Sequence, residues 1–171
     1  MKLLDDGTEL DGFRIGECLH AGGMAHVYEV TYADGRASPF PLVMKVPRMT
    51  AGDGAENIVS FEVELQMLQV LQGPHVPRLV SAGDLIHLPY LVMEHIPGQS
   101  LQQWLDQRQA ERQVVSVDDI VRIGVATAKA LQSLHAQNVC HLDLKPANIL
   151  LRPDGRVVLL DFGLSSHAHY P

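Results

Sequence analysis

The first hundred residues alternate short apolar runs with turn residues, a pattern that predicts β-strands. Phe13 to Cys18 and Val27 to Tyr32 flank a glycine-containing turn, and Leu42 to Val46 is a further β-rich run. Two more strands are expected at residues 79–84 and 90–94. Because turn residues separate these runs, we expect an antiparallel sheet.

One segment of this region has a different period and predicts a helix. Between residues 58 and 71 the apolar residues recur at spacings of three and four, as on one face of a helix. These residues are Ile58, Phe61, Leu65, Leu68 and Leu71.

After Pro97-Gly98 the pattern is mainly helical. Ser100 is expected to cap a short helix through Gln109, and Ser116 a longer one through about Gln137. The longer helix should bury a stripe of Ile120, Ile123, Thr127, Leu131 and Leu134. A hairpin with strands at residues 148–151 and 157–160 follows, around Pro153-Asp154-Gly155. The predicted fold class is therefore α+β.

Length and charge limit the classes of function. The 171 residues can bury one good core, or two small lobes that share a cleft. The net charge of −7, without a run of Lys or Arg, argues against nucleic acid as a partner. No apolar stretch approaches the roughly 20 residues that span a bilayer, and the N-terminus lacks a signal-peptide core. We therefore expect a cytoplasmic protein in which Cys18 and Cys140 are reduced, structural thiols.

The chemistry is concentrated in His141-Leu142-Asp143-Leu144-Lys145-Pro146-Ala147-Asn148 and, after it, Asp161-Phe162-Gly163. Phosphoryl transfer needs a carboxylate to orient a hydroxyl, a cation near the moving phosphate and oxygen ligands for Mg²⁺. Asp143 fits the first role and Lys145 the second, while Asn148 and Asp161 fit the third. If Asp143 and Asn148 merely capped a turn, Lys145 and Asp161 would be unexplained.

These residues resemble the catalytic loop H-R-D-L-K-P-x-N and the magnesium loop D-F-G of protein kinases. The resemblance implies a protein kinase of the bacterial serine/threonine type, which uses ATP and Mg²⁺ and phosphorylates Ser or Thr of a protein substrate. Lys145-Pro146 favours Ser/Thr over Tyr. His141 is expected to pack near Phe162 rather than act as a base.

The resemblance also implies a two-lobed architecture. Residues 1–96 would form an antiparallel five-stranded N-lobe with one main helix, and residues 97–171 the first, mainly helical part of the C-lobe. A kinase domain usually needs roughly 250 residues, so we expect the chain to be the N-terminal part of one. Apolar surface should then be exposed on the helix after Ser116 and beneath the catalytic loop.

A second motif lies in the turn between the first two predicted strands. The family pattern G-x-G-x-x-G-x-V keeps its second glycine as Gly22, while His20 and Ala25 replace the first and third. Backbone amides of such a turn can approach phosphates closely. The resemblance implies that the glycine-rich turn, His20-Ala21-Gly22-Gly23-Met24-Ala25, covers the phosphates of ATP; the alternative is a plain hairpin turn.

A lysine in an apolar strand is another candidate site residue. Lys45 could simply be solvated on the outer face of its strand, but a carboxylate from the following helix would give it a role. Glu62 and Glu64 are the candidates, and the family spacing favours Glu64. The resemblance implies that the ion pair directs Lys45 toward the α and β phosphates, with Glu62 exposed.

The adenine contacts follow from position in the family alone. Met93 would guard the back of the pocket, and the backbones of Glu94 and Ile96 would hydrogen-bond the base. The residues expected to sandwich the base are Val27, Val43 and Leu150, each of which could also be ordinary core.

Leu142 stands where the family has an arginine that pairs with a phosphorylated residue of the activation segment. Because leucine cannot make this contact, we expect that activity does not depend on such phosphorylation.

Two other functions remain open: a catalytically inactive nucleotide-binding or interaction module, and a small-molecule phosphotransferase of similar architecture. Lys145-Pro146 and the D-F-G triplet argue against the phosphotransferase.

Overall fold

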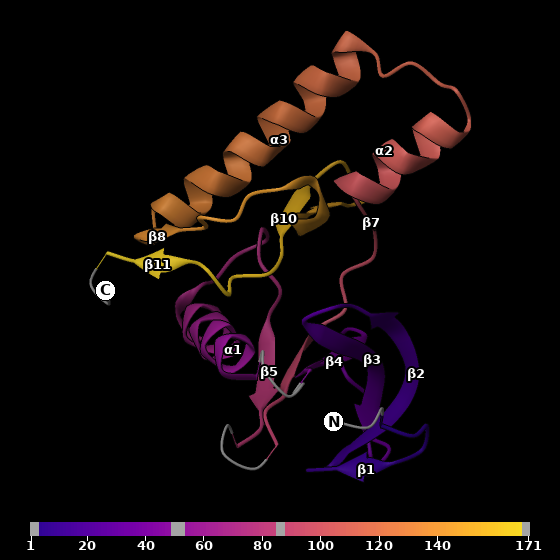
Figure 1. Ribbon diagram of the computed structural model, residues 1–171, viewed down its shortest axis with the longest axis vertical. Coiled ribbons are helices and arrows are strands. Elements are labelled where there is room, and N and C mark those ends of the chain that lie inside the picture. The colour runs from indigo at the N-terminus through magenta and orange to yellow at the C-terminus, as the bar shows by residue number, and fades with distance from the viewer. Residues whose placement is uncertain (1–3, 49–53, 85–87, 169–171) are drawn as a thin grey trace. The chain divides into compact units, whose positions relative to one another are not determined.

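The chain is described by a computed structural model that covers residues 4–48, 54–84 and 88–168 (Figure 1). It divides into two compact units. The first comprises Met1–Leu65 and Arg78–His95, and the second comprises Gln66–Pro77 and Ile96–Pro171. Each unit holds one part of the predicted site.

The first unit is built on an antiparallel sheet with the strand order β1-β2-β3-β4-β6-β5. Its central strands follow the predicted runs closely, whereas β1 is a short strand that pairs with the beginning of β2 and was not predicted. The sheet therefore has six strands rather than five. The strands are β1 (Glu9–Leu10), β2 (Phe13–Ala21), β3 (Ala25–Tyr32), β4 (Leu42–Pro47), β5 (Leu79–Ala82) and β6 (Leu91–Glu94).

One face of this sheet forms the core of the first unit. Side chains alternate between the two faces of a strand, so Leu42, Met44 and Val46 of β4 point to the same side. They join a buried cluster with Phe13, Ile15, Tyr28, Val30, Tyr90 and Val92. The intervening residues of β4, Val43 and Lys45, lie on the opposite face.

Helix α1 (Gly54–Val70) follows β4 and confirms the predicted helical period. It begins four residues before the predicted start at Ile58, and its buried side includes Phe61 and Leu68. Glu62 is exposed, as expected, whereas Glu64 is buried. The helix therefore turns Glu64 inward.

The helices of the second unit begin at the predicted caps. Ser100 caps α2 (Leu101–Ala110) in a capping box: Gln103 N donates to Ser100 Oγ at 3.1 Å, and Ser100 N donates to Gln103 Oε1 at 2.8 Å. Ser116 caps α3 (Val117–His135) by accepting from the main-chain N of Asp119 at 3.1 Å.

The predicted buried stripe of α3 is wrong at one end. Ile123 and Leu134 are buried together with Ala130, and Thr127 and Leu131 are half-buried, but Ile120 is 60% exposed. Helix α3 packs on β8 and β10 (Figure 1). The first turns of the helix expose Val117, Ile120, Val121 and Val125. The expectation of exposed apolar surface on this helix is confirmed.

A small sheet with the strand order β10-β9-β7 lies in the second unit, and its strand β9 directly follows the loop of residues 141–148. Strands β9 (Ile149–Leu151) and β10 (Val157–Leu159) form the predicted hairpin, and β7 (Gln99–Ser100) pairs with β9. Gly98 has φ +153°, and a Cβ there would lie 2.4 Å from the carbonyl oxygen of Leu151. A glycine is therefore required for β7 to approach β9 so closely. A second pair joins β8 (Val139–Cys140) to β11 (Ser166–His167).

Two further sequence expectations have structural counterparts. Cys18 and Cys140 are free thiols, as predicted, but both residues are exposed, so they do not pack as buried structural cysteines. Within the described ranges no helix is both long and apolar enough to cross a bilayer.

Candidate active site

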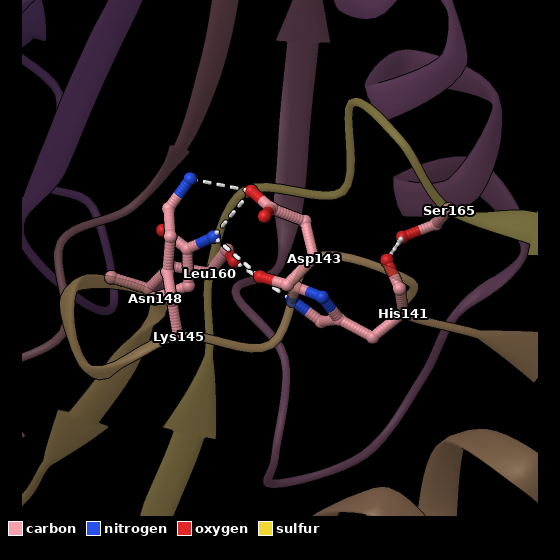
Figure 2. A network of polar contacts seen from close by, with 6 residues as sticks. All are labelled: His141, Asp143, Lys145, Asn148, Leu160 and Ser165. Carbon is pink, nitrogen blue, oxygen red and sulfur yellow. Dashed lines mark hydrogen bonds and ion pairs between the residues drawn. The ribbon is translucent and has the colours of Figure 1, made fainter.

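The catalytic loop joins β8 to β9 and includes a short 3₁₀ turn, Pro146–Asn148. The turn carries Asn148 back toward Asp143, and Asn148 Nδ2 donates to the main-chain oxygen of Asp143 at 3.0 Å and to its Oδ2 at 3.2 Å. Lys145 Nζ donates to the same Oδ2 at 2.6 Å. Figure 2 shows both side chains reaching the carboxylate of Asp143. Three predicted site residues thus meet at one carboxylate.

His141 anchors the beginning of this loop. It is 2% exposed, its Nε2 donates to the main-chain oxygen of Leu160 at 3.0 Å, and its ring lies 5.1 Å from that of Phe162. The contact with Phe162 is the one that the resemblance implies. The buried hydroxyl of Ser165 donates to the main-chain oxygen of His141 at 2.9 Å (Figure 2). Sequence reasoning missed Ser165, because no motif marks a serine that bonds to a distant carbonyl.

The electrostatics of the loop favour an ionised Asp143. The hydrogen bond from Lys145 is the largest cause that lowers the pKa of this carboxyl below its usual value. Partial burial opposes the effect, while the charge of Lys145 and the hydrogen bond from Asn148 add to it. Asp143 is therefore an acceptor at neutral pH.

Two site residues have left-handed backbone conformations. Leu142 has φ +59° and Asp161 has φ +64°, which residues other than glycine rarely adopt. Such strain is concentrated at functional sites, where the surrounding structure holds it. Leu142, which directly precedes Asp143, is 67% exposed.

Asn148 and Asp161 are the predicted metal ligands. Asn148 is buried, and its amide NH₂ donates to Asp143. The other amide atom, Oδ1, is an oxygen acceptor and is therefore the atom of Asn148 that can ligate a cation. Among the described residues no group of three or more His, Cys, Asp and Glu could hold a metal ion. Mg²⁺ suits this donor set, because it usually takes one or two protein oxygens and completes its shell with phosphates and water.

The first unit contains the predicted ion pair. Lys45 Nζ lies 2.5 Å from Glu64 Oε2, and Glu64 is 3% exposed. Lys45 is half-buried, so it is not a solvated residue on the outer face of the sheet. A buried carboxylate is costly without a cation, and Lys45 supplies it.

Several residues expected around the nucleotide share a face of the first sheet. Val27 lies opposite Lys45 in the β3–β4 pair, and Val43 lies opposite Met93 in the β4–β6 pair. By strand alternation these four side chains lie on the face opposite the core cluster. Glu94 ends β6.

The remaining residues expected to contact adenine belong to the second unit. Ile96 is buried, and Leu150 is half-buried on β9.

The glycine-rich turn joins β2 to β3. His20 and Ala21 end β2, Ala25 begins β3, and Gly22 N donates to the main-chain oxygen of Ala25 at 3.0 Å. A Cβ on Gly22 would lie 2.8 Å from His20 Nε2 and 3.3 Å from the oxygen of Ala25. A side chain at Gly22 would therefore displace the imidazole of His20 and press on the oxygen of Ala25, whereas a Cβ on Gly23 would meet nothing.

A family model described as the protein kinase domain matches residues 13–171. The chain belongs to the protein kinase family. This assignment accounts for the α+β fold, with a kinase-type antiparallel sheet in the first unit.

Bacterial and plant relatives support the kinase assignment. The chain is 28% identical over 90% of its length to a probable serine/threonine-protein kinase of Clostridium perfringens, and covers 21% of that protein. It is 29% identical over 91% of its length to the probable serine/threonine-protein kinase PknB of Lactococcus lactis, covering 24%. Protein kinase PVPK-1 of Phaseolus vulgaris is 33% identical over 96% of the chain, which covers 26% of it. This kinase-family chain thus spans about a quarter of these relatives.

The pKa of Asp143 tests the geometry of the catalytic loop without any assay of activity. Lys145→Met removes both the hydrogen bond and the positive charge that stabilise the carboxylate, so the pKa of Asp143 should rise toward the ordinary value. Carbon-detected NMR titration of the carboxyl groups measures it. Asp154, whose pKa is lowered chiefly by its hydrogen bond with Arg156, is the internal control and should not move. An unchanged titration of Asp143 would contradict the contact.

Proposed function

We propose that the protein is an ATP- and Mg²⁺-dependent serine/threonine protein kinase, which transfers the γ-phosphoryl group of ATP to a hydroxyl of a protein. The observation that carries the proposal is the meeting of Lys145 and Asn148 at the carboxylate of Asp143. A carboxylate, a cation and an amide oxygen within one loop are the groups that phosphoryl transfer requires.

Each residue of the loop has a distinct role in this proposal. Asp143, which Lys145 keeps ionised, accepts a hydrogen bond from the substrate hydroxyl, orients its oxygen and receives its proton. Lys145 places positive charge beside the transferred phosphoryl group. Asn148 and Asp161 would hold Mg²⁺, which would neutralise charge on the phosphates. His141 and Ser165 fix the loop from beneath.

The first unit supplies the nucleotide contacts in the proposal. Glu64 directs Lys45 toward the α and β phosphates, and the glycine-rich turn covers them with backbone amides. The apolar residues of this unit that would enclose adenine are Val27, Val43 and Met93, and the backbone of Glu94 would hydrogen-bond the base.

The substrate class rests on two observations. Lys145 is followed by Pro146, the pairing that resembles serine/threonine kinases, and relatives from Clostridium and Lactococcus bear the name probable serine/threonine-protein kinase. A cytoplasmic location belongs to the same proposal, because ATP and Mg²⁺ are supplied there.

Replacement of Asp143 tests the proposed reaction. Asp143→Asn keeps the size of the side chain but removes the base, so phosphoryl transfer from γ-labelled ATP to a generic Ser/Thr protein should fall about 10²- to 10⁴-fold. Asp154→Asn is the matched control, since Asp154 lies in the exposed β9–β10 turn, and it should retain full transfer.

Two results would count against the kinase proposal. Equal transfer by the Asp143→Asn variant and the wild type would exclude the assigned role of Asp143. A wild type that binds Mg²⁺-ATP but transfers nothing would favour the inactive nucleotide-binding module.

Leu142 carries a separate prediction about regulation. An exposed leucine cannot form the charge-assisted hydrogen bonds that an arginine makes with a phosphorylated residue. In a form of the protein that includes a complete activation segment, treatment with a phosphatase should change the initial rate of transfer less than about twofold. A loss of most of the activity, restored by rephosphorylation of that segment, would contradict the prediction.

A further inference from the structure

Arg48 makes two contacts with the glycine-rich turn. It directly follows β4, and its main-chain N donates to the oxygen of Met24 at 2.8 Å, which extends the β3–β4 pairing by one residue. Its side chain continues further, and Nη1 donates to the oxygen of Gly22 at 3.1 Å. One residue thus holds the turn at two carbonyl groups on either side of Gly23.

The carbonyl of Arg48 is in turn bound by helix α1. Asn57 Nδ2 donates to this oxygen at 3.1 Å. Asn57 precedes Glu64 by seven residues, which is about two helical turns, so both side chains project from the same side of α1. Asn57 and Glu64 therefore attach the helix to the segment that begins at Lys45 and ends at Arg48.

These contacts link the glycine-rich turn, helix α1 and strand β4 within the first unit. The turn is bound to Arg48, Arg48 to Asn57, and Glu64 of the same helix to Lys45, which lies three residues before Arg48. Each hydrogen bond to a main-chain carbonyl restrains the backbone as well as the side chain that makes it. A displacement of α1 would therefore move the carbonyl of Arg48 and, with it, the anchor of the turn.

The glycine-rich turn is costly to order without such contacts. Gly22 and Gly23 have many accessible backbone conformations, and ordering them costs conformational entropy. An arginine is suited to the task because its guanidinium is always charged and its planar group has several donors. A charged donor also makes a stronger hydrogen bond to a carbonyl than a neutral one does.

We propose that Arg48 is a positioning residue that couples the glycine-rich turn to helix α1, so that the turn and the Lys45–Glu64 pair are ordered together. The consequence for nucleotide binding rests on the proposed function, whereas the coupling itself does not. In the nucleotide-bound protein the anchored turn would present its amides to the phosphates without a further loss of entropy.

Amide hydrogen exchange of the nucleotide-free chain tests the coupling directly. Gly22 and Arg48 are suitable reporters, because both amides are hydrogen-bonded within the anchored region. Arg48→Gln removes the side-chain bond to the turn and should speed exchange of the Gly22 amide by at least about tenfold. Arg48→Lys keeps a charged donor and should have a smaller effect. Arg14→Gln, at an exposed arginine paired with Glu9, is the matched control and should leave both reporters unchanged.

Asn57→Ala distinguishes coupling from a purely local contact. Asn57 bonds to the carbonyl of Arg48, and the proposal predicts faster exchange at Gly22 as well as at Arg48 in this variant. Unchanged exchange at Gly22 in Asn57→Ala would overturn the coupling and leave only a local contact of Arg48 with the turn, and unchanged exchange at Gly22 in Arg48→Gln would exclude that contact as well. If Arg48→Gln does not fold, Arg48→Lys and Asn57→Ala decide the question in the same way.

A kinetic readout separates this inference from the proposed function. In a transfer assay Arg48→Gln should raise KM for ATP by about fivefold or more and change kcat less, because the turn contacts the nucleotide rather than the hydroxyl. A KM equal to that of the wild type, in an active enzyme, would overturn the consequence for nucleotide binding. Absence of transfer by the wild type would remove the proposed function, and the exchange data would still decide whether the coupling exists.

Discussion

The ion pair between Lys45 and Glu64 is the interaction on which the geometry of the first unit depends. Glu64 is almost completely buried, and a buried carboxylate without a cation is strongly unfavourable. Its partner must therefore come from the sheet, which fixes both the rotation of α1 and the face of β4 that carries Lys45. Val27, Val43 and Met93 share that face as a consequence of strand register.

Buried ion pairs are weak evidence for stability, because desolvation offsets much of their attraction. Their presence in a small domain is better explained by a function that needs a charge in a fixed place. In the second unit a carboxylate is likewise paired with a lysine, but the two residues are close together in the sequence. There the carboxylate of Asp143 meets Lys145 and Asn148 within one loop, and Leu142 and Asp161 have left-handed backbone conformations of the kind found at functional sites.

The sequence predicted the regular elements well where periodicity was strong. The strands around the glycine-rich turn and the capped helices of the second unit were found near their expected positions. The prediction that Ile120 is buried was wrong. The spacing of apolar residues identifies one face of a helix, but it does not show that another element packs on that face along the whole helix. The short strand β1 was missed for a related reason, since two residues cannot show a period.

The candidate site was predictable where the family motifs fix residue types, and less so where contacts involve the main chain. Lys45, Glu64, Asp143 and Asn148 lie in patterns of recognisable spacing, and the structure brings each of them to its partner. The residues that support them gave no such signal. Arg48, Asn57 and Ser165 all bond to main-chain carbonyls, which every residue type offers, so neither pattern nor spacing identifies them.

The central claim is that the Lys45–Glu64 pair is built to bind the phosphates of a nucleotide. Calorimetric titration with Mg²⁺-ATP tests it most directly, with Lys45→Met and Glu64→Gln compared with the wild type. The matched control is Glu62→Gln, at an exposed position on the same helix. We expect the wild type and Glu62→Gln to bind alike, and the other two variants to bind at least about tenfold more weakly. Equal affinity in all four proteins, or no binding by the wild type, would contradict the account.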